Sequence, residues 1–172
     1  MQERGGTTMI LDENLDRRDV TKTRKPQYRA LAARYNTKPR WVYGLPCILP
    51  DASGRYHCKV NAIRANDGSV YPIKPDTLSE YTGCDDFNGT PIYEGDIVNK
   101  SRNYVRLVQY NERYGAYVTI CKRQRNNYSV DYLSKGDTLC RHLEVLGNMW
   151  QNPELLNQHC YTDYSLEEVY KD

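Results

Sequence analysis

Residues 81–98, YTGCDDFNGTPIYEGDIV, decide the local fold, because turn residues alternate here with short extended runs. Residues 86–89 (DFNG) carry the residue types of a tight turn, since Asn and Gly adopt positive φ at low cost. Thr90 and Pro91 begin an extended run, and proline fixes φ at a value that suits extended chain. Residues 94–96 (EGD) form a second turn. Two turns and two short strands in this stretch predict the start of a compact β-barrel or a tightly coiled sheet.

The alternation of β-rich runs and turns continues on both sides of this stretch. Residues 66–68 (NDG) are a strong hairpin signal, and residues 74–80 fit a single helical turn. Asn152 is a suitable cap for a short helix that begins at Pro153. A second short helix is expected at residues 165–170, after a possible capping box. The expected strands are residues 45–50, 55–64, 70–73, 104–110, 116–121, 128–133 and 143–148.

These elements predict an α+β chain that is mostly β. We expect a small antiparallel barrel or coiled sheet, SH3-like in part, followed by one or two short C-terminal helices. The length of 172 residues suits one domain and is sufficient to bury a core without disulfides or metal. Residues 28–35 (YRALAARY) are ambiguous, because their Ala and Leu residues favour a helix.

Three stretches of the chain resemble the YopX-like family of phage and prophage proteins. They are residues 92–98 (IYEGDIV), 40–44 (RWVYG) and 145–156 (VLGNMWQNPELL). The resemblance implies that residues 28–35 form a strand, and that the protein acts in the cytoplasm of a bacterial host. We therefore expect a flexible N-terminal extension at residues 1–24, a YopX-like β-rich domain at residues 25–157 and an acidic tail at residues 158–172.

The cysteines and histidines give no recognisable metal or redox motif. Six cysteines are present, but no CxxC pair occurs and the His–Cys spacings match no common zinc template. The N-terminus has no apolar segment typical of a signal peptide, so we expect the thiols to stay reduced in the cytosol. No apolar run approaches the roughly 20 residues that cross a membrane. We expect no disulfide, no metal, no cofactor and no membrane association.

Glu94 and Asp96 are the carboxylates best placed for acid–base or metal chemistry, because they lie together beside a turn. The alternative is that Gly95 and Asp96 shape the turn, with the Asp96 side chain accepting hydrogen bonds from backbone amides. No GxSxG, P-loop or GxGxxG pattern occurs, and we expect no catalytic residues. The signature turn, which consists of Tyr93, Glu94, Gly95 and Asp96, is a candidate binding element instead.

Charge is distributed unevenly along the chain. Residues 17–40 hold nine Lys or Arg against Asp19 alone, and residues 100–125 hold seven against Glu112 alone. The segment from Pro153 to the end holds five acids and one lysine. This asymmetry predicts either an anionic partner for the basic segments or internal pairing with the acidic tail.

Tyrosine is the other unusual feature of the composition, with sixteen Tyr against one Phe. Tyrosine suits half-buried strand positions, and its flat ring with a polar tip also suits contact with a partner. A second candidate surface combines such rings with cations on neighbouring predicted strands, which suits phosphate contact and base stacking. The alternative is a solvated strand face whose charges prevent aggregation. The surface consists of Lys100, Arg102, Tyr104, Arg106, Tyr117, Lys122, Arg123 and Arg125.

The sequence therefore leads to two hypotheses about function. The first is a non-enzymatic phage or prophage accessory protein that binds a host macromolecule, in particular a protein. The second is a nucleic-acid-binding module that uses the basic, tyrosine-rich face.

Overall fold

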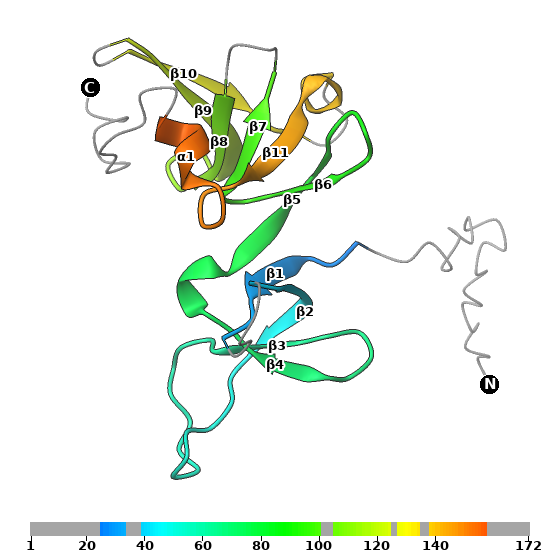
Figure 1. The fold of residues 1–172 in the computed structure, drawn as a ribbon, viewed down its shortest axis with the longest axis vertical. Coiled ribbons are helices and arrows are strands. Elements are labelled where there is room, and N and C mark those ends of the chain that lie inside the picture. Colours follow the sequence, from blue (N-terminus) through cyan, green and yellow to red (C-terminus); the bar gives the residue numbers. More distant parts are fainter. Residues whose placement is uncertain (1–24, 34–38, 101–104, 125–126, 135–137, 158–172) are drawn as a thin grey trace, which may run out of the picture.

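The computed structural model of the protein describes residues 25–33, 39–100, 105–124, 127–134 and 138–157. Two antiparallel sheets make up the fold (Figure 1). The first has the strand order β4-β3-β2-β1-β5-β6 and the second has the order β10-β9-β8-β7-β11. The mostly-β prediction is confirmed, and the sheets stay open rather than closing into a barrel.

The strands are short and follow one another closely. The first sheet contains β1 (Tyr28–Leu31), β2 (Trp41–Cys47), β3 (Ala62–Arg64), β4 (Val70–Pro72), β5 (Ser79–Asp85) and β6 (Pro91–Tyr93). The second contains β7 (Asp96–Asn99), β8 (Val105–Asn111), β9 (Ala116–Gln124), β10 (Asn127–Tyr132) and β11 (Glu144–Asn148). The 3-10 turns η1 (Pro75–Thr77) and η2 (Cys140–His142) and the helix α1 (Pro153–Asn157) complete the described elements.

Most of the predicted turns and strands are present. β1 confirms the strand expected within residues 28–35, and η1 confirms the helical turn expected within residues 74–80. The hairpin between β3 and β4 turns at Gly68, whose φ is +84°. The short helix begins at Pro153 as expected. The extension at residues 1–24, the tail at residues 158–172 and the helix expected within that tail lie outside the described residues.

The strand expected at residues 55–64 is wrong for most of its length, because only Ala62–Arg64 pairs as β3. A carboxylate organises the preceding loop: Asp51 accepts hydrogen bonds from the backbone N–H of Ser53 and of Arg55 at 2.8 and 3.0 Å. The Asp51 carboxylate also contacts the His57 ring at 2.9 Å. Such local side-chain bonds compete with a strand ladder for the backbone groups.

Strand β5 connects the two halves of the molecule (Figure 1). Its first residues pair with β1, where Glu80 lies opposite Tyr28, and its last residue, Asp85, lies opposite Pro91 of β6. The register shifts along β5, and Gly83 within it has a φ of +85°. A positive φ inside a strand is typical of a bulge that bends the chain. The bend allows β5 to pair with β1 at its start and with β6 at its end.

Three apolar clusters form the core. One lies within the first sheet and contains Ala30, Ala32, Val42, Ile63 and Ile73. A second joins the end of β5 and β6 to the second sheet and contains Cys84, Ile92, Val98, Val108, Leu133, Cys140 and Leu143. In the third, Leu155 and Leu156 of α1 pack against Ile97, Val105 and Leu107. Among the described residues, no helix is long and apolar enough to span a membrane.

Candidate functional site

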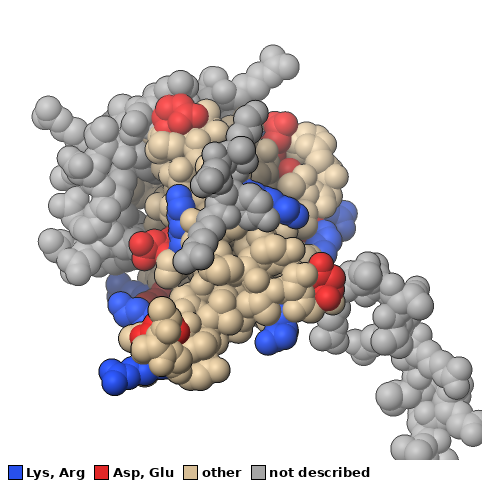
Figure 2. All heavy atoms as spheres, turned by 60° about the horizontal axis from the view of Figure 1, so that its bottom comes forward, with Lys and Arg blue, Asp and Glu red and all other residues tan. Residues whose placement is uncertain are grey.

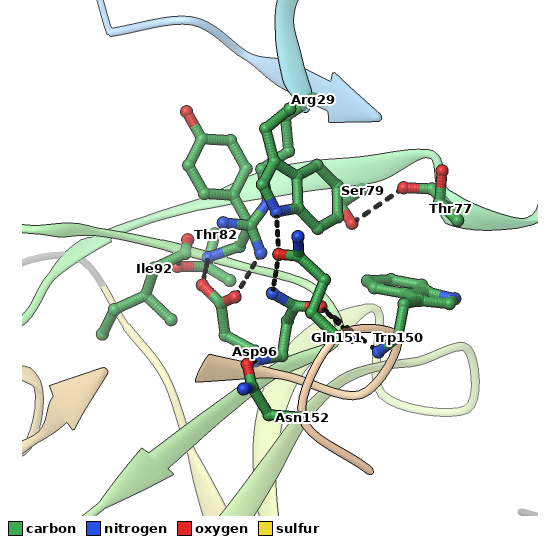
Figure 3. Close-up of polar contacts among 12 residues, drawn as sticks. Arg29, Thr77, Ser79, Thr82, Ile92, Asp96, Trp150, Gln151 and Asn152 are labelled. Atoms are coloured by element: carbon green, nitrogen blue, oxygen red, sulfur yellow. Dashed lines mark hydrogen bonds and ion pairs between the residues drawn. The ribbon is translucent and has the colours of Figure 1, made fainter. Parts of the chain in front are cut away.

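The signature turn lies between β6 and β7, and its Asp96 forms a buried ion pair with Arg29 of β1. The two side chains are 1% and 8% exposed, and Figure 3 shows them pointing toward one another from different sheets. The second Asp96 oxygen, Oδ2, accepts a hydrogen bond from the Tyr93 N–H at 2.8 Å. Both oxygens of Asp96 are therefore engaged inside the protein.

The Arg29 guanidinium lies between two aromatic rings. Its central carbon is 4.3 Å from the ring centroid of Trp41 and 4.4 Å from that of Tyr93. Cations are attracted to ring faces at such distances, and the attraction is larger away from water. The Tyr93 hydroxyl also donates to the Pro26 carbonyl at 2.8 Å. Arg29 thus has a carboxylate and two ring faces to compensate its buried charge.

Gly95 allows the chain end after β11 to pack onto the signature turn. Its φ is +77°, and a Cβ atom built there would lie 2.3 Å from Cη2 of Trp150. The Gly95 carbonyl accepts a hydrogen bond from the Met149 N–H at 2.9 Å. Trp150 in turn contacts Trp41 edge-on, with ring centroids 5.8 Å apart, and the Trp41 Nε1–H donates to Gln151 Oε1 at 2.6 Å.

These contacts make one unit that holds the two sheets together. We call it the inter-sheet joint, and it consists of Arg29, Trp41, Tyr93, Gly95, Asp96 and Trp150. Three of the four residues expected to bind a partner, Tyr93, Gly95 and Asp96, are buried in it. Burial keeps these three residues away from the surface of the structure, where a partner would bind. Glu94 is half-buried and accepts a hydrogen bond from the Tyr110 N–H at 3.2 Å.

Burial raises the pKa of Asp96 to about 6, although the Arg29 charge and the Tyr93 N–H both oppose this rise. A raised pKa means that the folded protein holds the Asp96 proton more tightly than the unfolded chain does. The stability from this proton is fully present below about pH 4 and is lost as the pH rises through about 6. A shift of this size corresponds to about 3 kcal/mol.

We therefore expect the stability advantage of the wild-type protein over Asp96→Asn to shrink as the pH rises from 4.5 to 7.5. Asparagine does not titrate, so the comparison removes the contributions of all other groups. Urea unfolding of both proteins at several pH values measures the difference. An advantage that grows with pH would show that the Arg29 charge lowers the pKa more than burial raises it.

With this geometry in place, the comparison with protein families is informative. The family model described as YopX protein matches residues 41–157. The chain belongs to the YopX family. The resemblance found in the sequence is thereby confirmed, and the match includes the signature turn, Trp41 and Trp150 but begins after Arg29. No curated protein matches the chain.

Within the YopX match, two cations of the predicted basic face, Lys100 and Arg106, share one carboxylate, Asp131. Arg106 is 4% exposed, and its guanidinium contacts Asp131 at 3.0 Å and Thr119 Oγ1 at 3.1 Å. Lys100 also contacts Asp131, at 3.2 Å. The expectation that Arg106 is an exposed phosphate contact is wrong, because β8 buries it against β9 and β10.

Of the remaining residues of this face, Tyr117 is the one whose side chain the structure describes. Tyr117 is half-buried, and its hydroxyl donates to Glu80 Oε2 at 2.8 Å. Arg102, Tyr104 and Arg125 lie outside the described residues, as do the side chains of Lys122 and Arg123.

Figure 2 presents the opposite end of the molecule, which carries β3 and β4. There, blue and red side chains are dispersed around a mostly uncharged surface.

Exposed aromatic residues lie at the end of the β8–β9 hairpin and at the end of the neighbouring strand β10. Tyr110, Tyr114 and Tyr132 are 41%, 53% and 48% exposed. Tyr110 packs edge-on against Tyr117 with ring centroids 5.1 Å apart, and Tyr114 packs likewise against Tyr132 at 5.7 Å. We call these four residues the aromatic hairpin.

The sequence analysis did not identify Tyr114 and Tyr132 as site residues. A signal for part of the group was present, because Tyr110 ends one predicted strand and Tyr117 lies near the start of the next. Residues near a hairpin loop become cross-strand partners, and Tyr110 lies opposite Tyr117. The Asn111 side chain fixes the loop by accepting from the N–H of Arg113 at 3.0 Å.

Proposed function

We propose that this protein is a non-enzymatic accessory protein, encoded by a phage or prophage, that binds a protein in the cytoplasm of a bacterial host. The exposed aromatic hairpin is the observation that supports this proposal. Tyrosine is enriched at protein interfaces, because its ring offers apolar area and its hydroxyl offers a hydrogen bond. Each of the four rings packs against another ring, which limits the entropy that binding would cost.

The positions of the Glu94 and Asp96 carboxylates favour a binding role over an enzymatic one. Acid–base chemistry at the signature turn would need a carboxylate that can reach a substrate. Asp96 is instead held by Arg29 and by the Tyr93 N–H in the interior. The Glu94 and Asp96 side chains therefore do not act as a pair at one surface.

A protein partner also agrees better with the local charges than nucleic acid does. Glu94 contacts the backbone of Tyr110, and Glu80 contacts the Tyr117 hydroxyl. Carboxylates at these positions repel phosphates, while Lys100 and Arg106 both pair with Asp131. Phosphate contacts, which dominate nucleic-acid affinity, are not favoured at this surface.

Affinity capture from host lysate with the double variant Tyr114→Ser/Tyr132→Ser tests the proposal. We expect at least about a tenfold loss of a captured host protein, because interface tyrosines often contribute more than 1 kcal/mol each. Tyr56→Ser is the matched control, since Tyr56 is 71% exposed and lies in the loop before β3. Circular dichroism confirms that each variant is folded, and quantitative mass spectrometry measures the recovery.

Equal recovery of all proteins by the wild type and the double variant would refute the aromatic hairpin as the interface. Nucleic acid is examined with the same variants, by fluorescence anisotropy of single-stranded and duplex DNA at about 50 mM salt. DNA binding that is lost in the double variant would replace the protein partner with nucleic acid. Absence of DNA binding at this low salt concentration would remove that alternative.

A further inference from the structure

Three tyrosines and two glutamates from both sheets meet beside the aromatic hairpin. The hydroxyls of Tyr28 and Tyr117 donate to the two oxygens of Glu80, at 3.1 and 2.8 Å. The Tyr110 N–H donates to Glu94, and the Tyr110 ring packs on Tyr117. We call these five residues the tyrosine–carboxylate cluster. It is built from β1, β5, β8, β9 and the signature turn.

The cluster holds two negative charges without a cation among the described residues. Within the part of the chain that the structure describes, the donors to Glu80 are neutral, namely Gln27, Tyr28 and Tyr117. The described donor to Glu94 is the backbone N–H of Tyr110. Some other described carboxylates do have a cationic partner, as Asp85 has in Lys25 and Asp131 has in Lys100.

The direction of the Tyr117 pKa shift agrees with a cluster that carries negative charge. Burial raises its pKa above the ordinary value for tyrosine, and the charges of Glu80 and Glu94 raise it further. Both carboxylates therefore act on the same ring. An anionic group would be repelled here, whereas a cation would be attracted by the carboxylates and by the ring faces.

We propose that the tyrosine–carboxylate cluster receives one arginine or lysine side chain of a protein partner. Charge complementarity identifies the occupant, and Tyr110, which is 41% exposed, makes the cluster accessible from solvent. The cluster shares Tyr110 and Tyr117 with the aromatic hairpin, and these two rings lie on the face of the sheet opposite to Tyr132. This inference rests on the proposed protein-binding function.

Titration of the full-length protein with N-acetyl-arginine amide and N-acetyl-lysine amide tests the inference, with two-dimensional NMR as the readout. N-acetyl-citrulline amide is the control probe, because it has nearly the shape of the arginine probe without its charge. We expect the ring and backbone signals of Tyr110 and Tyr117 to shift with a dissociation constant in the low millimolar range, about 1–5 mM. The citrulline probe is expected to leave them unchanged.

Variants locate the binding. Glu94→Gln and Tyr110→Leu are each expected to weaken binding of the arginine probe at least about threefold. Tyr56→Leu is the matched control and is expected to bind normally, because Tyr56 is 71% exposed in the loop before β3 and belongs to neither the cluster nor the aromatic hairpin.

The outcomes separate this inference from the proposed function, because the probes need no partner protein. Equal shifts with the citrulline probe, unchanged binding by Glu94→Gln, or no shift at roughly 10 mM probe would each overturn the cationic site. If host-protein capture still depends on Tyr114 and Tyr132 in that case, the aromatic hairpin stands without the cluster. If the probes bind as expected but capture is insensitive to the hairpin variants, the cation site stands and the proposed interface fails.

Discussion

Replacing Arg29 with leucine is expected to lower the free energy of unfolding by about 3–5 kcal/mol at neutral pH. The change leaves Asp96 buried without its cationic partner, and an uncompensated buried charge carries a penalty of this size. It also removes the contacts of the guanidinium with the rings of Trp41 and Tyr93. Urea unfolding followed by tryptophan fluorescence measures the effect.

Two further variants show whether the ion pair is the cause. Arg64→Leu is the matched control, because Arg64 belongs to the same sheet but is exposed, and we expect a change within about 0.5 kcal/mol. The double variant Arg29→Leu/Asp96→Leu removes both charges and is expected to be more stable than Arg29→Leu alone. If Arg29→Leu is as stable as Arg64→Leu, the ion pair does not hold the sheets together.

Replacing Gly95 with alanine is expected to cost about 2–4 kcal/mol. Two effects add here: a positive φ that L-residues disfavour, and a Cβ atom that would overlap the Trp150 ring. The first effect costs about 1 kcal/mol and the overlap about 1–3 kcal/mol. The midpoint of chemical unfolding and its slope measure the loss.

Gly89→Ala separates the two effects. Gly89 has a nearly identical φ of +80°, but nothing lies within 4 Å of the position that its Cβ would occupy. We expect Gly89→Ala to cost only about 1 kcal/mol, as the conformational effect alone requires. In a Trp150→Leu background, the cost of Gly95→Ala is expected to fall toward the same value. An equal cost for Gly89→Ala and Gly95→Ala in the wild-type background would exclude the overlap with Trp150.

The parts of the fold that could be predicted from the sequence are those determined by residues adjacent in the chain. The turn at residues 86–89, the NDG hairpin and the helix start at Pro153 are each specified by two to four adjacent residues. Residues 28–35 show the limit of this reasoning. Their composition favours a helix, but pairing with β2 and β5 on both sides makes Tyr28–Leu31 a strand.

The interactions that the sequence did not predict join residues far apart in the chain. Arg29 and Asp96 are 67 positions apart, and no local pattern marks them as partners. Arg106 was expected on an exposed face, yet Val105, Leu107 and Val108 around it are all buried. A strand that is buried on both faces loses the alternation from which exposure is inferred. The ion-pair partner of Arg106, Asp131, lies two strands away in β10.

The position of β1 has a consequence for the order in which the molecule is completed during synthesis. β1 lies between β2 and β5, so β1 lacks its second pairing until Glu80 has left the ribosome. The hydrogen bond from Trp41 to Gln151 forms later still, because Gln151 is synthesised 110 residues after Trp41. At about 5–20 residues per second, this delay is roughly 5–20 s. The joint between the sheets therefore closes only after Trp150 has been synthesised, and chains released before Trp150 would leave the signature turn uncovered.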